Sequence, residues 1–240
     1  MLYEYIVFST DTQHSDIPRC LPFLIKPCRQ SQVRAVKVIR MSMQQAGQLL
    51  ALDPDVQILH LIRDPRGMLL SQKRVGDINN WNNIKAEANH RCSRILKDIE
   101  ESAALVSTFP GRVLSVRYED IAEHPVLSTN LMYKWLGLDM TDQLKEYITN
   151  TTHGSADGCA ICTVRKNATW TAYRWKEVLD WRSISVIQQQ CVQLMRHMGF
   201  RIYQSKQQLA ALPVPKHEDY SKHLYKLKDI ASQINVDSIK

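Results

Sequence analysis

Short apolar runs occur at three places in the first half of the chain. The most continuous is Ile58–Ile62, which only His60 interrupts, and a second run covers Val113–Val116. A third covers residues 33–39, where Lys37 lies among the valines. Continuous apolar runs of this length are typical of strands that are buried on both faces, as in a parallel sheet. We therefore expect a strand in each of the three segments.

Between and after these runs, apolar residues recur at steps of three and four, the spacing of one helix face. The longest such segment runs from about Ile84 to Phe109 and ends before Pro110. A shorter one begins after Ser42, a good N-cap, and runs to about Leu52. Further helices are expected at about 125–136, 142–149, 183–198 and 224–234. Strands separated by helices predict an α/β fold, a parallel sheet flanked by helices.

The chain changes character just after Ile58–Ile62. Asp64 is a good N-cap and Pro65 a good first helical residue, so strand, tight turn and helix follow one another. Arg63 then lies at the carboxyl end of a strand, where ligands bind in open α/β sheets. Gly67, which leaves room for close approach, and Ser71 are four residues apart and share one helix face.

These groups together predict a site for a dianionic phosphate, helped by the free N–H groups of the helix start. The alternative is that Arg63 pairs with a surface carboxylate and that Ser71 is merely exposed. The sequence of this stretch leaves both interpretations open.

The sequence RDPR at 63–66, followed by Ser71, resembles the 3′-phosphate-binding motif of Golgi carbohydrate sulfotransferases. These enzymes use 3′-phosphoadenosine 5′-phosphosulfate (PAPS) as sulfuryl donor, and their first Arg and the Ser hold the 3′-phosphate. The resemblance assigns these roles to Arg63 and Ser71. It extends from about Cys20 to Tyr203 and is greatest to the branch that sulfates the 6-hydroxyl of Gal, GlcNAc or GalNAc.

The resemblance implies a P-loop-kinase-like sulfotransferase fold, a glycan or proteoglycan acceptor and a location in the Golgi lumen. It places a partial sulfotransferase domain at residues 1–203. Residues 204–240 remain as a polar, Lys-rich C-terminal tail with room for one helix.

Two further segments carry candidate nucleotide contacts. The sequence RYED at 117–120 resembles an element of many sulfotransferases, which implies that Tyr118 lies near the nucleotide. In the alternative, Tyr118 packs internally, and we interpret Glu119 and Asp120 as residues that favour a helix start.

The second segment contains Arg165 and Lys166 and precedes two tryptophans. It resembles the nucleotide-closing loop of sulfotransferases, with cations for phosphate and rings for stacking on adenine. A solvated basic loop over a Trp-rich patch is the alternative. Asn167 begins a glycosylation sequon, and a glycan there would crowd the loop, so we expect Asn150 to be the better glycan acceptor.

One part of the family's donor site is missing from the sequence. A Gly/Ser-rich loop for the 5′-phosphosulfate is expected upstream of residues 33–39, yet no glycine precedes Gln32 and no G-x-x-x-x-G-K-[ST] motif occurs. We therefore expect the fold to lack its first strand and this loop, and residues 1–240 to bind nucleotide weakly without sulfation. No catalytic residue is assigned, and His60 is interpreted as a core histidine.

Composition limits the partners. The 240 residues include 31 Lys and Arg against 24 Asp and Glu, and the net charge of +7 suits an anionic ligand. No nucleic-acid-binding signature accompanies this charge, so we expect no nucleic acid partner. There is neither an eighteen-residue apolar run nor a basic n-region, so we expect membrane attachment only through an anchor absent from this chain.

Six cysteines leave disulfides and reduced thiols both open. They are Cys20, Cys28, Cys92, Cys159, Cys162 and Cys191. A zinc site would need a second ligand pair beside the lone CxxC, so we expect no metal. The resemblance to a lumenal family favours some disulfides.

Two function classes follow. The first is transfer of a sulfuryl group from PAPS to a sugar hydroxyl. The second is a non-catalytic relative that binds PAP or an anionic glycan through the surviving phosphate site.

Overall fold

The structure is a computed structural model that describes residues 30–31, 33–39, 41–157, 159, 162–211, 215, 217–220 and 223–233. The chain divides into two compact units, Met1–Met41 and Ser42–Lys240. The second unit contains every strand that the structure describes.

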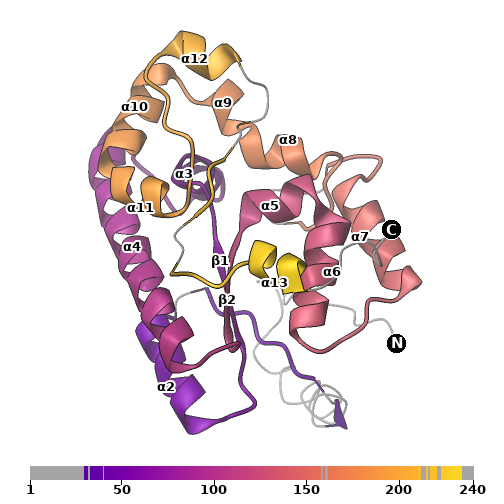
Figure 1. Ribbon diagram of the computed structural model, residues 1–240. Helices are drawn as coiled ribbons and strands as arrows, with labels where there is room; N and C mark the ends of the chain where they lie inside the picture. Colours follow the sequence, from indigo (N-terminus) through magenta and orange to yellow (C-terminus); the bar gives the residue numbers. More distant parts are fainter. Residues whose placement is uncertain are drawn as a thin grey trace, which may run out of the picture. The chain divides into compact units, whose positions relative to one another are not determined.

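A two-stranded parallel sheet forms the middle of the second unit (Figure 1). Strand β1 (Ile58–Ile62) pairs with β2 (Val113–Arg117), with Ile58 opposite Val113 and Ile62 opposite Arg117. Both strands were predicted from their apolar runs. The parallel register brings the carboxyl ends of the two strands together, so that the segments after Ile62 and Arg117 begin side by side.

The third predicted strand is not present, because residues 33–39 form no strand and their valines and Ile39 are exposed. Apolar β-branched residues raise strand propensity, but a strand forms only where a neighbouring strand supplies hydrogen bonds and packing. The prediction of burial on both faces also holds for one strand only. All of β2 is buried, whereas Leu59 and Leu61 of β1 are 40% and 52% exposed.

Helices lie on both sides of the strands (Figure 1). The long helix α4 (Ile84–Thr108) runs alongside the sheet and packs against α2 (Met43–Leu52), α10 (Trp181–Gln190) and α11 (Val192–His197). The other side carries α5 (Tyr118–Glu123), α6 (Pro125–Trp135), α7 (Asp142–Thr152), α8 (Ala168–Tyr173) and α13 (Leu227–Gln233). The remaining elements are α3 (Pro65–Arg74), η1 (Trp81–Asn83), α9 (Trp175–Val178) and α12 (Lys206–Ala211).

Local capping explains where several helices begin. The Ser42 hydroxyl accepts a hydrogen bond from the N–H of Gln45, whose side chain in turn accepts from the N–H of Ser42. This reciprocal pair is a capping box, and it fixes the predicted start of α2. The helix expected to begin at residue 183 begins earlier, because Asp180 is the N-cap and accepts from the N–H of Ser183.

The buried face of α4 follows the predicted spacing for four turns and then shifts by one residue. Beyond Ile99 the buried positions are Ser102 and Leu105, where the sequence had suggested Ala103 and Val106. Apolar residues at alternating steps of three and four repeat every 3.5 residues on average, whereas a straight helix has 3.6 residues per turn. Over a helix of this length, the row of such positions therefore rotates slowly around the helix, and the buried face moves to neighbouring residues.

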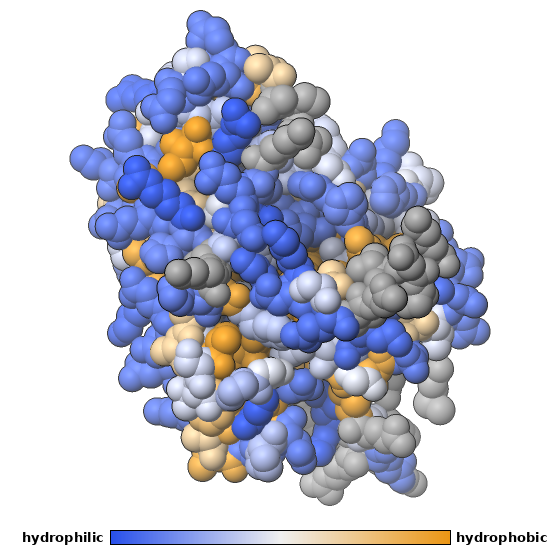
Figure 2. All heavy atoms as spheres, in the orientation of Figure 1, coloured by the Kyte–Doolittle hydropathy of each residue, from blue (hydrophilic) through white to orange (hydrophobic). Residues whose placement is uncertain are grey.

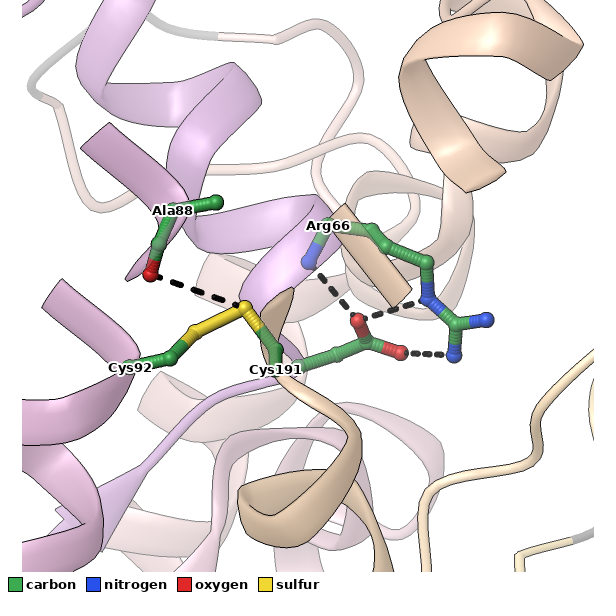
Figure 3. The surroundings of a disulfide bond; sticks show 5 residues. Arg66, Ala88, Cys92 and Cys191 are labelled. Atoms are coloured by element: carbon green, nitrogen blue, oxygen red, sulfur yellow. Dashed lines mark hydrogen bonds and ion pairs between the residues drawn. A yellow bond between two sulfur atoms is a disulfide. The ribbon is translucent and has the colours of Figure 1, made fainter. Parts of the chain in front are cut away.

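A disulfide between Cys92 and Cys191 ties α4 to the end of α10 within the main core (Figure 3). A second disulfide joins the exposed Cys159 and Cys162. Cys20 and Cys28 lie outside the described residues.

The residues after Tyr203 pack on the same core. Leu209, Tyr220 and Leu224 belong to the main cluster of buried side chains. Leu227 and Ile230 of α13 pack against Leu114 and Val116 of β2. The sequence had suggested one helix in this segment, and the structure shows two, α12 and α13.

The surface on the face drawn in Figure 2 is mainly hydrophilic, with hydrophobic residues in small separate groups. None of the helices in the described part of the chain is long and apolar enough to cross a bilayer. Within that part there is also no group of three or more His, Cys, Asp or Glu that would suit a metal ion.

Candidate functional site

The turn between β1 and α3 has the predicted capping geometry. Asp64 is the N-cap of α3, Pro65 is the first helical residue, and the Asp64 carboxylate accepts from the N–H of Arg66 at 2.9 Å. This cap uses one of the N–H groups of the first turn, and proline has none. The helix start therefore offers fewer free N–H groups to a ligand than the sequence suggested.

Arg66 is completely buried and fully paired. Its guanidinium donates to both carboxylate oxygens of Asp64, at 2.9 and 2.6 Å (Figure 3). It also donates to Gln188 at 2.9 Å. The guanidinium carbon lies 4.0 Å from the ring centroid of Trp175. A buried cation with this many partners is part of the core, so Arg66 has a structural role.

Arg63 has the opposite environment. Its guanidinium stacks 4.5 Å over the Tyr118 ring, and within the described part of the chain it makes no hydrogen bond or ion pair. Its Nε is buried without an acceptor. A buried donor without a partner carries a free-energy penalty, which an anionic ligand at this position would remove. The alternative that Arg63 pairs with a surface carboxylate is wrong for the described residues.

The close approach expected at Gly67 is made by the protein itself. A Cβ at this position would lie 3.2 Å from Cδ1 of Trp175 and 3.3 Å from the carbonyl oxygen of Ala172. The sequence motif could not show this, because both contacts come from more than a hundred residues further along the chain. Gly67 therefore allows α3 to pack on the α8–α9 junction.

Ser71 lies on the same helix face as Arg63. The Nε of Arg63 is 3.5 Å from the Cβ position of Gly67, so the arginine side chain runs along the Gly67 side of α3. Ser71 is one turn further along that side and half-buried, and its hydroxyl makes no hydrogen bond with any described residue. The two residues predicted to hold a phosphate thus share one face and both have donors to spare.

Glu119 lies beneath this turn. One carboxylate oxygen accepts from the N–H of Asp64 at 3.1 Å, and the other is buried without a partner. Burial, followed by the negative charge of Asp64, raises the pKa of Glu119 to about 8. Glu119 and Asp120 do lie in the first turn of α5, but Asp120 also pairs with Arg117 at 2.9 Å.

Arg174 interacts electrostatically with several other arginines, Arg63 among them. The pKa of Arg174 is lowered first by its partial burial and then by the charges of three other arginines. These are Arg74, Arg63 and Arg165. Like charges gather at such a position when an anion is bound there, so this arginine cluster suits an anionic ligand.

A sequence model described as "Sulfotransferase family" matches residues 17–142, slightly more than half of the chain. The chain belongs to this family. The matched region contains the β1–α3 turn, Ser71 and Tyr118, and the α/β fold with its parallel strands agrees with that membership.

The chain is similar to several curated relatives. It is 28% identical to human carbohydrate sulfotransferase 3 over 210 residues, which cover 79% of this chain and 44% of that protein. It is 30% identical to human carbohydrate sulfotransferase 5 over 203 residues, which cover 75% of this chain and 49% of that protein. The chain spans about half the length of the relatives it matches. No solved structure matches it significantly.

The loop before α8 brings one of its two predicted cations, Arg165, to the arginine cluster. The N–H of Arg165 donates to Thr151 at 2.8 Å, and its carbonyl accepts from Gly154, which fixes the loop on the end of α7. The Lys166 side chain is exposed, and the described contacts do not group it with the arginine cluster. The amide oxygen of Asn167 caps α8 by accepting from the N–H of Trp170.

Sequence reasoning missed two residues of the arginine cluster. Arg74 follows Ser71 by three residues on α3, a spacing that places it on the same helix face and that could have found it. Arg174 was noted only as part of a Trp-containing segment. Its place beside Arg63 depends on the packing of the α8–α9 junction on Gly67, for which the sequence contains no local signal.

A buried polar group near α8 was also missed. The Tyr173 hydroxyl bonds Glu123 and lies 2.8 Å from Nε2 of His217. Burial lowers the pKa of His217 to about 4, so this imidazole is neutral at physiological pH. His60, interpreted as a core histidine, is only half-buried, and its Nδ1 lies 2.7 Å from the Ser102 hydroxyl of α4.

Proposed function

We propose that this sulfotransferase transfers a sulfuryl group from PAPS to a sugar hydroxyl, at the 6-position of Gal, GlcNAc or GalNAc in a glycan or proteoglycan. The curated relatives are carbohydrate sulfotransferases, which supports a carbohydrate acceptor. The observation that carries the donor assignment is the unpaired Arg63 guanidinium at the carboxyl end of β1, beside the unpaired Ser71 hydroxyl.

In the proposal, Arg63 and Ser71 hold the 3′-phosphate of the donor. A guanidinium and a hydroxyl on one face can both donate to phosphate oxygens, and charge-assisted hydrogen bonds of this kind are strong. The Tyr118 ring holds the Arg63 guanidinium in place through its stacking contact. The missing side chain of Gly67 leaves room for the α8–α9 junction to pack against α3. Gly67 therefore affects nucleotide binding only indirectly.

The rest of the arginine cluster and the basic loop surround this phosphate. The local positive potential is raised by Arg74, Arg165 and Arg174. This potential attracts the nucleotide and partly neutralises the negative charge of its phosphates. Lys166 would reach the nucleotide only if its loop closes over the site. PAPS supplies the sulfuryl group in activated form, and the protein supplies position and charge stabilisation. A Golgi lumenal location belongs to this proposal and rests on the family alone.

The donor assignment can be tested by titration calorimetry with PAP. Arg63→Ala should weaken PAP binding by about 2–3 kcal/mol, because a charge-assisted hydrogen bond is lost. Ser71→Ala should lower the PAP binding free energy by less, because the hydrogen bond from the Ser71 hydroxyl to phosphate has an uncharged donor. Arg196→Ala, which removes an exposed arginine from α11, is the charge-matched control and should leave affinity unchanged.

Equal PAP affinity in wild type and Arg63→Ala would overturn the donor assignment. Transfer itself is measured by radiolabelled sulfate incorporation into Gal- or GlcNAc-terminated acceptors. Because residues 1–240 alone are expected not to transfer, the assay uses the chain prefixed with a segment that contains the 5′-phosphosulfate loop. Arg63-dependent binding together with no transfer by that prefixed protein would favour the non-catalytic alternative, a PAP- or glycan-binding protein.

A further inference from the structure

Trp175 is fully buried, yet its indole N–H has no hydrogen-bond acceptor. Three tryptophans that are more exposed each have one: Trp81 donates to Ser183, Trp135 to the carbonyl of Gly111, and Trp170 to Glu177. Buried indole N–H groups normally find a partner, since a lost hydrogen bond is costly in an apolar environment. The most buried indole of this set is therefore the exception.

The unpaired N–H belongs to the ring edge that contacts Gly67. The Cδ1 atom, which is bonded directly to Nε1, lies 3.2 Å from the Cβ position of Gly67. The unpaired Nε of Arg63 lies 3.5 Å from the same point. Two buried donors without acceptors thus flank Gly67 from different segments of the chain, and the Ser71 hydroxyl follows one turn along the same face.

This combination selects a ligand with several acceptor oxygens and a negative charge. All three groups are donors, and the arginine cluster around them is positive. Neither acid of this turn bonds these donors, because Asp64 pairs with Arg66 and Glu119 accepts from the N–H of Asp64. A tetrahedral phosphate offers separate oxygens to donors that arrive from different directions.

We infer that the indole N–H of Trp175 donates to the same phosphate that Arg63 and Ser71 hold. This inference rests on the proposed function and adds a ligand-binding residue from the second half of the chain. The inference also assigns Arg66 a positioning role in the site. The Arg66 guanidinium is fixed by Asp64 and Gln188 and covers the Trp175 ring face at 4.0 Å, so it holds the indole in position before the ligand arrives.

Two variants remove the N–H. Trp175→Phe keeps an aromatic ring over Arg66 but leaves a smaller side chain, and Trp175→benzothienylalanine keeps the full ring shape with sulfur in place of the N–H. Both should weaken PAP binding by about ten- to a hundredfold, as expected for one hydrogen bond to a charged group. The melting temperature without PAP should be unchanged in the benzothienylalanine variant, since no bond within the protein is lost.

Trp81→Phe is the matched control, because its indole donates to Ser183 within the protein. It should lower the melting temperature and leave PAP affinity unchanged, the opposite result. In a ¹⁵N-labelled protein, the indole signal assigned to Trp175 should move on addition of PAP and of inorganic phosphate. The same signal should stay in place in Arg63→Ala.

The outcomes separate the inference from the proposed function. If PAP binds Arg63→Ala as tightly as wild type, the donor assignment fails and the inference fails with it. If Arg63→Ala binds weakly but both Trp175 variants bind as wild type, with an unmoved indole signal, the inference alone is wrong and Trp175 is only a packing residue.

Discussion

At the scale of single residues, the two arginines of the RDPR sequence have different environments although they lie three positions apart. Arg66 is buried and neutralised by Asp64, whereas Arg63 lacks an ionic partner among the described residues. The sequence singles out Arg63 as a phosphate ligand but contains no local signal for the role of Arg66. The distinction arises from Gln188 and Trp175, which pack around Arg66 from the second half of the chain.

Arg66→Ala should therefore destabilise the fold by about 3–5 kcal/mol, because it leaves the Asp64 carboxylate buried without its counter-ion. Urea unfolding measures this loss. Arg63→Ala is the comparison, and its stability should be equal to or above that of wild type, because an unpaired buried donor is removed. Similar losses in the two variants would contradict the separation of roles.

Glu119 predicts a dependence of stability on pH. Its pKa is raised from 4.5 to about 8 in the folded protein, first by burial. Above pH 4.5 the unfolded chain releases this proton while the folded protein keeps it, so stability falls as pH rises. The stabilisation that the retained Glu119 proton provides is complete below pH 4.5 and lost by about pH 8. Between these values the free energy of unfolding falls by at most about 1.4 kcal/mol per pH unit.

Glu119→Gln cannot titrate, so its free energy of unfolding should depend less on pH between 5 and 8 than that of wild type. The two proteins are compared by urea unfolding across this range. Profiles that run parallel would show that Glu119 does not keep its proton in the folded state.

At the scale of secondary structure, the sequence predicts helix starts and strands where capping residues and local apolar runs determine them. The capping residues Ser42 and Asp64 and the apolar runs of β1 and β2 located four elements correctly. The prediction failed where tertiary partners decide, as in residues 33–39, which have strand propensity but form no strand. The same limit applies to the candidate site, where spacing suggests Arg63 and Ser71 but contains no signal that Trp175 and Arg174 pack beside them.

Gly67 tests how tightly α3 packs on the α8–α9 junction. Gly67→Ala should destabilise the fold by about 1–3 kcal/mol, because its Cβ would lie within 3.3 Å of Trp175 and of the Ala172 backbone. Calorimetric melting without ligand measures the change.

Gly47→Ala is the control within another helix. Its Cβ would meet only the flexible end of Leu105, so the gain in helix propensity should offset the contact. Equal stability of Gly67→Ala and Gly47→Ala would mean that the junction can move away from α3.

At the scale of the whole molecule, the site joins distant parts of one chain. Arg63 and Ser71 come from the first third, whereas Trp175 and Arg174 come from the last third. The Cys92–Cys191 disulfide, which spans 99 positions of sequence, links α4 to α10 in the core that supports this junction. Closing a loop of this size lowers the entropy of the unfolded chain, which favours the folded arrangement.

The same disulfide makes the middle of the chain a covalent ring. The basic loop between α7 and α8 lies inside this ring, and it exposes Lys166 to a protease that cleaves after basic residues. After a single cleavage there, the disulfide should hold the two fragments together as one molecule. Its mass should exceed that of the uncut protein by one water molecule only. On a gel without reductant the cut protein should run as one band, and with reductant it should separate into two fragments. Fragments that separate without reductant would show that the ring is open.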